Sequence, residues 1–320
     1  MQRFHKKNIR WTLFALGMYA LLFVLVQTGV INFYYESTFI TIMINIIYAV
    51  GLNLILGVAG QFSLGHAGFI AIGSYSGAIL GKMINGLPGL FAGMAVGVVI
   101  SVIVAFLVGL PTLRLKGDYL AIATLGVAEI IRVAVTNMKI TNGAAGISGI
   151  PLTNTWTITY IFLVVTTILI LNYTFSSAGR ATYGVLQDEI AAESMGVQVT
   201  KYKILAFVLG AATASIGGTL SATTLGAVTP GDFTFMKSID VLIIVVFGGI
   251  GSFTGSFVAA VLLGIINLVL QPFGQLRMII YAVALILIMI FRPGGLLGTW
   301  EFKLGNLKFS KKKEAKESGK

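Results

Sequence analysis

The chain has 320 residues, of which 57% are hydrophobic and only 10% are charged, and its mean hydropathy is +0.94. Soluble domains carry about a quarter charged residues, so this composition excludes a water-soluble fold and predicts an all-α polytopic membrane protein. The net charge of +11 gathers at the two ends of the chain, which argues against nucleic-acid binding and favours a partner that is a lipid bilayer.

Basic residues divide the chain into three parts. Residues 1–10 are a basic N-terminus, residues 11–293 a transmembrane domain, and residues 294–320 a Lys-rich tail. Because lysine and arginine collect on the cytoplasmic side of membrane proteins, both ends are expected in the cytoplasm. The number of membrane crossings is then even.

The candidate spans follow from the length that a helix needs to cross a bilayer, about 20 apolar residues. In chain order they are 11–30, two spans within 37–81, 87–110, 119–135, 156–175, 204–228, two spans within 238–270, and 278–291. This predicts about ten transmembrane helices, or eight if the two glycine-broken stretches are re-entrant. With ten, the polar segment 180–203 is cytoplasmic, whereas 142–156 and 230–237 lie outside.

Glycine and serine interrupt one helix in each half of the chain. Gly60 and Ser63 share their spacing with Gly249 and Ser252, which hints at two related halves. One interpretation is tight helix packing through small residues. The other is a pair of broken helices that expose backbone to a cavity, as in many transporters.

Several uncharged residues, most of them polar, lie within or beside these breaks and are candidates for a pathway or a gate. They are Asn53, Gln61, Ser63, His66, Gly249 and Ser252. The alternative for His66 is a hydrogen bond to a neighbouring helix, and Asn53 and Gln61 could equally join helices. No second histidine or carboxylate lies near His66 in sequence and the chain has no cysteine, so no metal site is expected.

Glu129 and Arg132 lie three residues apart within one predicted span, so they share a helix face and can form an ion pair. Charged residues inside a membrane are costly and commonly functional. The pair could act in transport, or it could fix the packing of helices. The sequence alone leaves both open.

The segment 180–203 is a polar island with helix-forming residues and its own acidic cluster. In a membrane protein such a segment usually contacts something soluble, and Gly196 can end its helix. The chain has no Walker A sequence and no catalytic constellation, so we expect neither ATP hydrolysis by this chain nor enzymatic activity.

Residues 188–196 resemble the Glu-Ala-Ala…Gly loop of ABC importer permeases, with Ile190 in place of an acidic residue. In that class the loop docks on the ATPase subunit. The resemblance implies a coupling role for Asp188, Glu189, Ala191, Ala192, Glu193 and Gly196.

Four longer stretches are similar to the M-type permease of branched-chain amino-acid ABC importers: residues 51–69, 113–126, 141–151 and 229–252. The resemblance implies a permease subunit that moves leucine, isoleucine and valine across the cytoplasmic membrane of a prokaryote. It also implies a homologous second permease, two ABC ATPases that hold ATP and magnesium, an extracytoplasmic binding protein, and no cofactor on this chain.

Two other functions remain possible. One is an ABC importer permease for urea or short amides, which close relatives of the resembled family carry. The other is a secondary amino-acid transporter driven by an ion, with Glu129 or Asp240 as the coupling carboxylate.

Overall fold

The computed structural model describes residues 33–115, 117–270 and 294–298, together with the single residues 17, 19, 23, 283 and 286. Apart from these single residues, the predicted first span, 11–30, and last span, 278–291, lie outside the described residues, as do most of the basic ends. By its contacts the chain forms two units, residues 1–30 with 302–320, and residues 31–301. All the elements named here belong to the second unit.

The second unit is built almost entirely of helices. In chain order they are α2 (Phe33–Asn53), η1 (Leu54–Val58, a π-helix), α3 (His66–Met83), α4 (Leu87–Thr112), α5 (Asp118–Asn137), η2 (Gly143–Ala145), α6 (Trp156–Phe175), α7 (Ser177–Gln187), α8 (Glu189–Ser194), α9 (Val199–Leu225), η3 (Pro230–Phe233), α10 (Phe235–Gly248) and α11 (Phe253–Leu270). Two short antiparallel strands, β1 (Ile147–Ser148) and β2 (Ala227–Val228), pair with each other. The predicted all-α class is confirmed.

Six helices in the described part of the chain are long and apolar enough to cross a membrane: α2 with η1, α4, α5, α6, α9 and α11. The helices α3 and α10 are not among them, and each adjoins a break in the chain. A multi-pass membrane protein is thus confirmed, while the total of ten crossings stays a prediction.

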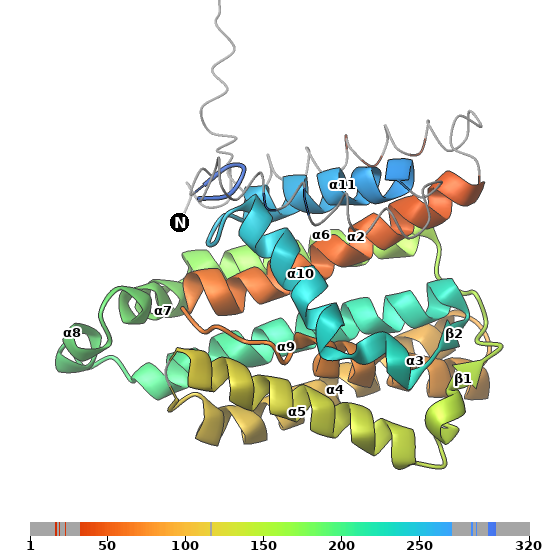
Figure 1. Cartoon of the computed structure of the whole chain (residues 1–320), viewed down its shortest axis with the longest axis horizontal. Coiled ribbons are helices and arrows are strands. Elements are labelled where there is room, and N and C mark those ends of the chain that lie inside the picture. Colours follow the sequence, from red (N-terminus) through yellow and green to blue (C-terminus); the bar gives the residue numbers. More distant parts are fainter. Residues whose placement is uncertain are drawn as a thin grey trace, which may run out of the picture. The chain divides into compact units, whose positions relative to one another are not determined.

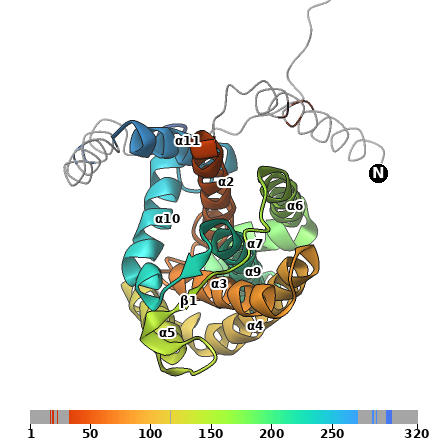
Figure 2. The same cartoon turned by 90° about the vertical axis from the view of Figure 1, so that its right-hand side faces the viewer.

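The helices α3 and α9 form the centre of the bundle, and the other helices surround them (Figure 2). The two helices approach so closely that a Cβ on Gly73 would lie 2.0 Å from the carbonyl oxygen of Ser215. Hydroxyls then bond across the contact: Ser74 donates to the Gly218 carbonyl and Thr219 to the Gly73 carbonyl, both at 2.9 Å. Small residues and hydroxyls of this kind join helices in lipid, where no hydrophobic drive favours association.

The first predicted break is confirmed. The α2 helix passes into the π-helix η1, a form frequent at functional sites, and residues 59–65 then run back along the bundle without helical structure. Figure 1 shows that α3 therefore starts deep inside the unit rather than at its end. Non-helical backbone is tolerated at membrane depth only where protein or water surrounds it.

The second predicted break is also confirmed. It separates α10 from α11, and both of its glycines adopt left-handed backbone angles, φ +115° at Gly249 and +87° at Gly251. The helices on its two sides meet so closely that a Cβ on Gly255 would lie 2.1 Å from the Gly248 carbonyl oxygen. A side chain at these positions would separate the two helices.

The predicted coupling segment, 180–203, and the strand pair lie at opposite ends of the bundle. In Figure 1, α7 and α8 project at the left end of the helices, whereas β1 and β2 lie at the right end. That 180–203 and 142–156 face opposite sides of the membrane stays a prediction.

Candidate functional site

The short helix α8 is defined by a cap at each end. The Asp188 carboxylate accepts hydrogen bonds from the N–H groups of Ile190 (2.9 Å) and Ala191 (3.0 Å), as an N-cap does. At the other end the N–H of Gly196 donates to the Glu193 carbonyl at 2.9 Å, and the next N–H donates to Ala192. With φ +82° at Gly196, this is a Schellman ending, which agrees with the predicted role of that glycine.

An ion pair fixes α8 against the bundle. Glu189 pairs with Lys203 of α9, whose side chain is almost completely buried. Ala192 is buried beside it, while Ala191 and Glu193 are exposed. Of the predicted coupling residues, Glu189 and Ala192 therefore hold α8 in place, and the others cap it or face outward.

Two apolar residues at the tip of this segment were not among the predicted coupling residues. Ile190 is 77% exposed and Met195 is 85% exposed. Ile190 departs from the acidic residue of the resembled loop, and an apolar residue within a polar segment is itself a signal for a contact surface. Exposed apolar side chains beyond the membrane-spanning helices favour a protein partner there.

The coupling segment touches the first helix break. Leu186, two residues before the Asp188 cap, packs on Gly60, where an added Cβ would lie 2.5 Å from its Cδ1. Gly60 has φ +68°, a backbone conformation that favours glycine. A cleft of about 320 Å³ opens beside this contact, lined by Ala59, Gly60 and residues 185–190.

Asn53 joins the two breaks, which are almost 200 residues apart in sequence. Its amide nitrogen donates to the Ser252 carbonyl (2.8 Å) and to the Ser256 hydroxyl (3.0 Å). Its amide oxygen accepts from the N–H of Gly251 at 2.9 Å. Asn53 is fully buried, so these bonds replace the water that the free backbone of the second break would need.

Hydroxyls from two other helices hold the start of α3. Thr124 of α5 accepts from the N–H of Leu64 at 3.0 Å, and Ser238 of α10 accepts from the N–H of Ala67 at 2.9 Å. Residues 63–66 thus lie at the meeting point of α3, α5 and α10. This point is well inside the bundle, because Ser63 and His66 are both buried.

Aromatic and charged groups continue from His66 toward α10. The His66 ring stands edge-on to the ring of Tyr48, with centroids 6.5 Å apart. The Lys237 ammonium lies 5.6 Å from the centroid of the same Tyr48 ring, within cation–π range. His66 therefore belongs to a polar cluster in the interior rather than to an isolated position.

Gln61 is buried with both amide atoms unpaired among the residues that the structure describes. Leaving a buried polar group without a partner costs about 1–3 kcal/mol. In the chain, Gln61 lies between Gly60, which contacts Leu186, and the start of α3 at His66. A residue that joins helices would have its amide hydrogen-bonded to a neighbouring helix. The unpaired Gln61 amide therefore favours the predicted pathway role over a role in joining helices.

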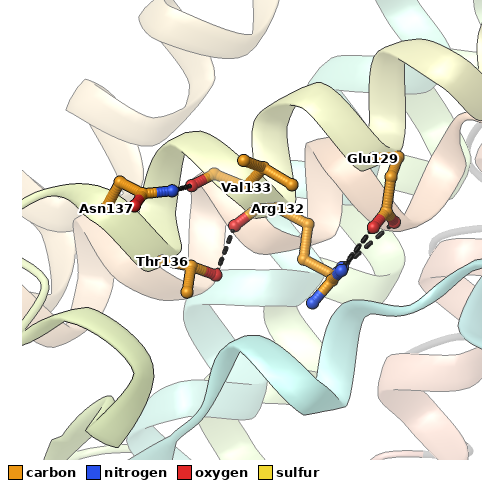
Figure 3. A network of polar contacts seen from close by, with 5 residues as sticks. All are labelled: Glu129, Arg132, Val133, Thr136 and Asn137. Carbon is orange, nitrogen blue, oxygen red and sulfur yellow. Dashed lines mark hydrogen bonds and ion pairs between the residues drawn. The ribbon is translucent and has the colours of Figure 1, made fainter.

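The ion pair of Glu129 and Arg132 forms as predicted. The Arg132 Nε donates to both carboxylate oxygens at 3.0 Å, and the guanidinium also contacts Oε1 (Figure 3). The side chains are not enclosed by the bundle: that of Glu129 is 44% exposed and that of Arg132 is 28% exposed. The pair therefore lies at the surface of this chain rather than in its interior.

Comparison with known proteins places these features in a family. Over residues 34–291 the chain matches the family described as "Branched-chain amino acid transport system / permease component". It is 37% identical over 290 residues to the high-affinity branched-chain amino acid transport system permease protein LivM of Salmonella typhimurium, and 36% identical to that of Escherichia coli K12, covering 80% of this chain and 68% of each relative. The corresponding permease protein LivH of E. coli K12 is 24% identical over 78% of this chain and 90% of its own length. No solved structure matches.

Proposed function

The chain belongs to the family of branched-chain amino acid transport permeases, and we propose that it carries leucine, isoleucine and valine inward across the cytoplasmic membrane of a prokaryote. In this proposal it is the non-catalytic permease subunit of an ATP-driven importer. The names of its relatives and its multi-pass helical bundle support the assignment.

The proposed importer has four further subunits. A homologous second permease is supported by the similarity of this chain to both LivM and LivH, which occur together in S. typhimurium and in E. coli K12. Two ABC ATPases bind ATP and magnesium, so this chain needs no cofactor. A binding protein outside the membrane supplies most of the selectivity.

One observation carries the mechanism: Leu186, next to the coupling helix, packs directly on Gly60 at the first helix break. We infer that ATP-driven closure of the ATPases pushes on the exposed tip of α8, and that Leu186 passes the push to Gly60. The Gln61 amide and His66 follow Gly60 in the chain, so the same movement changes the polar interior.

This mechanism fixes the orientation of the chain. The end of the bundle that carries α7 and α8 faces the cytoplasm, and the end with β1 and β2 faces the binding protein. With ten crossings, the N- and C-termini are both cytoplasmic. The basic residues at the two ends support this orientation.

Replacing Gly60 by alanine tests the coupling contact. The added methyl group must displace Leu186, so we expect leucine uptake by the reconstituted importer to fall by about tenfold or more, equivalent to about 1.4 kcal/mol, while ATP hydrolysis continues. Gly149→Ala is the matched control, because Gly149 has nearly the same φ, +70°, with open space around it at the opposite end of the bundle. Equal uptake by the two variants would disprove the coupling role of Gly60.

A secondary transporter driven by an ion is the second candidate, and the partly exposed Glu129 carboxylate is the observation in its favour. Uptake that survives ATP depletion but is lost with the proton gradient would support it.

The substrate is tested separately, by measuring whether leucine, urea or a short amide raises the melting temperature of the binding protein.

A further inference from the structure

The Glu129–Arg132 pair lies near the middle of a membrane-spanning helix. At a rise of about 1.5 Å per residue, Glu129 is about 16 Å beyond the start of α5 and about 12 Å before its end. Arg132 is nearer to that end, about 8 Å from it. In a helix that crosses the membrane, the Glu129 carboxylate therefore lies near mid-depth, and Arg132 lies between it and the end of the helix.

The Glu129 side chain, 44% exposed, lies on the side of α5 that is turned away from α3, and Arg132, 28% exposed, lies at the edge of that side. The buried face of α5 packs on α3, where a Cβ on Gly65 would lie 2.8 Å from the Thr124 carbonyl oxygen and one on Gly68 would lie 2.9 Å from the Cα of Ala128. Figure 2 shows α5 at the outside of the bundle, with α3 beside it and nearer the centre. A charged pair on this outer face would meet lipid if nothing covered it, and charged groups in hydrocarbon are strongly disfavoured.

The outer face of α5 has the form of a helix contact surface. Ile122, Gly126, Glu129 and Val133 follow one another at helical spacing along it, and we call them the α5 stripe. Among the described residues, a Cβ added at Gly126 would meet no heavy atom within 4 Å, so this glycine serves no packing in that part of the chain. A small residue one turn from a polar pair lets a second helix approach closely in lipid.

Arg132 has hydrogen-bonding capacity left for a partner. The guanidinium has five N–H donors, and Glu129 engages only those on Nε and one terminal nitrogen. The other terminal nitrogen, Nη1, makes no hydrogen bond to the residues that the structure describes. A carbonyl, hydroxyl or carboxylate oxygen on a neighbouring helix would satisfy it.

We propose that the α5 stripe is the surface on which the second permease of the importer docks. The depth of the pair selects this occupant, because ATPases and a binding protein are soluble and cannot reach the middle of the bilayer. The similarity of this chain to permeases of two types supports a second membrane-embedded subunit. The inference rests on the proposed function only in requiring an importer with two permeases.

Cross-linking in the assembled importer tests the surface. The chain has no cysteine, so one introduced cysteine is its only thiol and can carry a benzophenone group. Ile122→Cys and Val133→Cys place the group on the α5 stripe, and Val99→Cys and Ile103→Cys, of similar exposure, place it on α4. The complex is held in lipid nanodiscs and illuminated.

We expect the α5 probes to shift this chain to the summed mass of the two permeases, with the second permease identified by mass spectrometry, and the α4 probes to label lipid. Labelling of lipid alone from α5, or a cross-link to a second copy of this chain, would overturn the proposal. Leucine uptake by the same complex separates the two hypotheses. Cross-linking without leucine transport counts against the proposed substrate, whereas transport without cross-linking counts against the surface.

Discussion

The helices α4 and α5 bury the same share of their residues within the chain but present different side chains to the outside. In the most apolar stretch of each helix, 28% of the residues are buried. The exposed residues of α4 are apolar throughout, among them Val99, Ile103 and Phe106, whereas α5 exposes part of Glu129 near mid-span and part of Arg132 one turn further on. The share of buried residues therefore does not distinguish a helix face that contacts lipid from one that contacts a protein partner. The charge of the exposed residues is what distinguishes the two faces.

The largest expected effect comes from placing a charge on the α4 surface. Val99 lies near the middle of α4, so Val99→Arg puts a cation into lipid and should destabilise the isolated chain by about 2.5–3.5 kcal/mol. The measurement is the unfolding free energy in detergent–lipid bicelles. Tyr183→Arg, an exposed position on α7 beyond the spans, is the control. If both variants are equally stable, α4 does not face lipid and the comparison fails.

The second expected effect comes from the α5 pair itself. Glu129→Gln or Arg132→Gln leaves one uncompensated charge within the span, so either change should lower the amount of second permease that copurifies by about tenfold, equivalent to about 1.4 kcal/mol. The double variant removes both charges and should recover most of the loss. Quantitative mass spectrometry of the purified complex gives the ratio. Single variants that copurify like the native chain would show that the pair is not at the interface.

The smallest expected effect concerns Gly126 on the α5 stripe. Because nothing surrounds this glycine in the isolated chain, Gly126→Ala should stabilise it by about 0.5–1 kcal/mol through helix propensity alone. Gly73→Ala, at the tight contact of α3 with α9, should instead destabilise it. Thermal unfolding of the purified chain compares the two. Destabilisation by Gly126→Ala would mean that the stripe is already occupied within this chain.

Local sequence patterns were enough to predict the helices and their breaks. The span 156–175 coincides with α6, and the glycine–serine clusters at 60–63 and 249–252 mark the two interruptions. These features depend on residues close in the chain: a long apolar run forms a helix, and left-handed glycines end one. The Glu129–Arg132 pair was predictable for the same reason, because a helix brings residues three apart together.

Contacts between distant segments were beyond the sequence. No local pattern indicates that Asn53 bonds to Ser252, or that Glu189 pairs with Lys203. The sequence also did not predict that the Glu129–Arg132 pair would be partly exposed. Its exposure depends on which face of α5 packs against Gly65 and Gly68. Such contacts are decided by tertiary packing rather than by spacing.

The shared amide of Asn53 has a consequence for leakage through the membrane. If α2 and the second break moved apart, the Gly251 N–H and the Ser252 carbonyl would lose the Asn53 amide, and the buried amide would lose both partners. The two halves of the chain are thus expected to rearrange in a concerted step. A transporter built this way has no intermediate in which one half has opened and the other has not, and solutes gain no continuous route across.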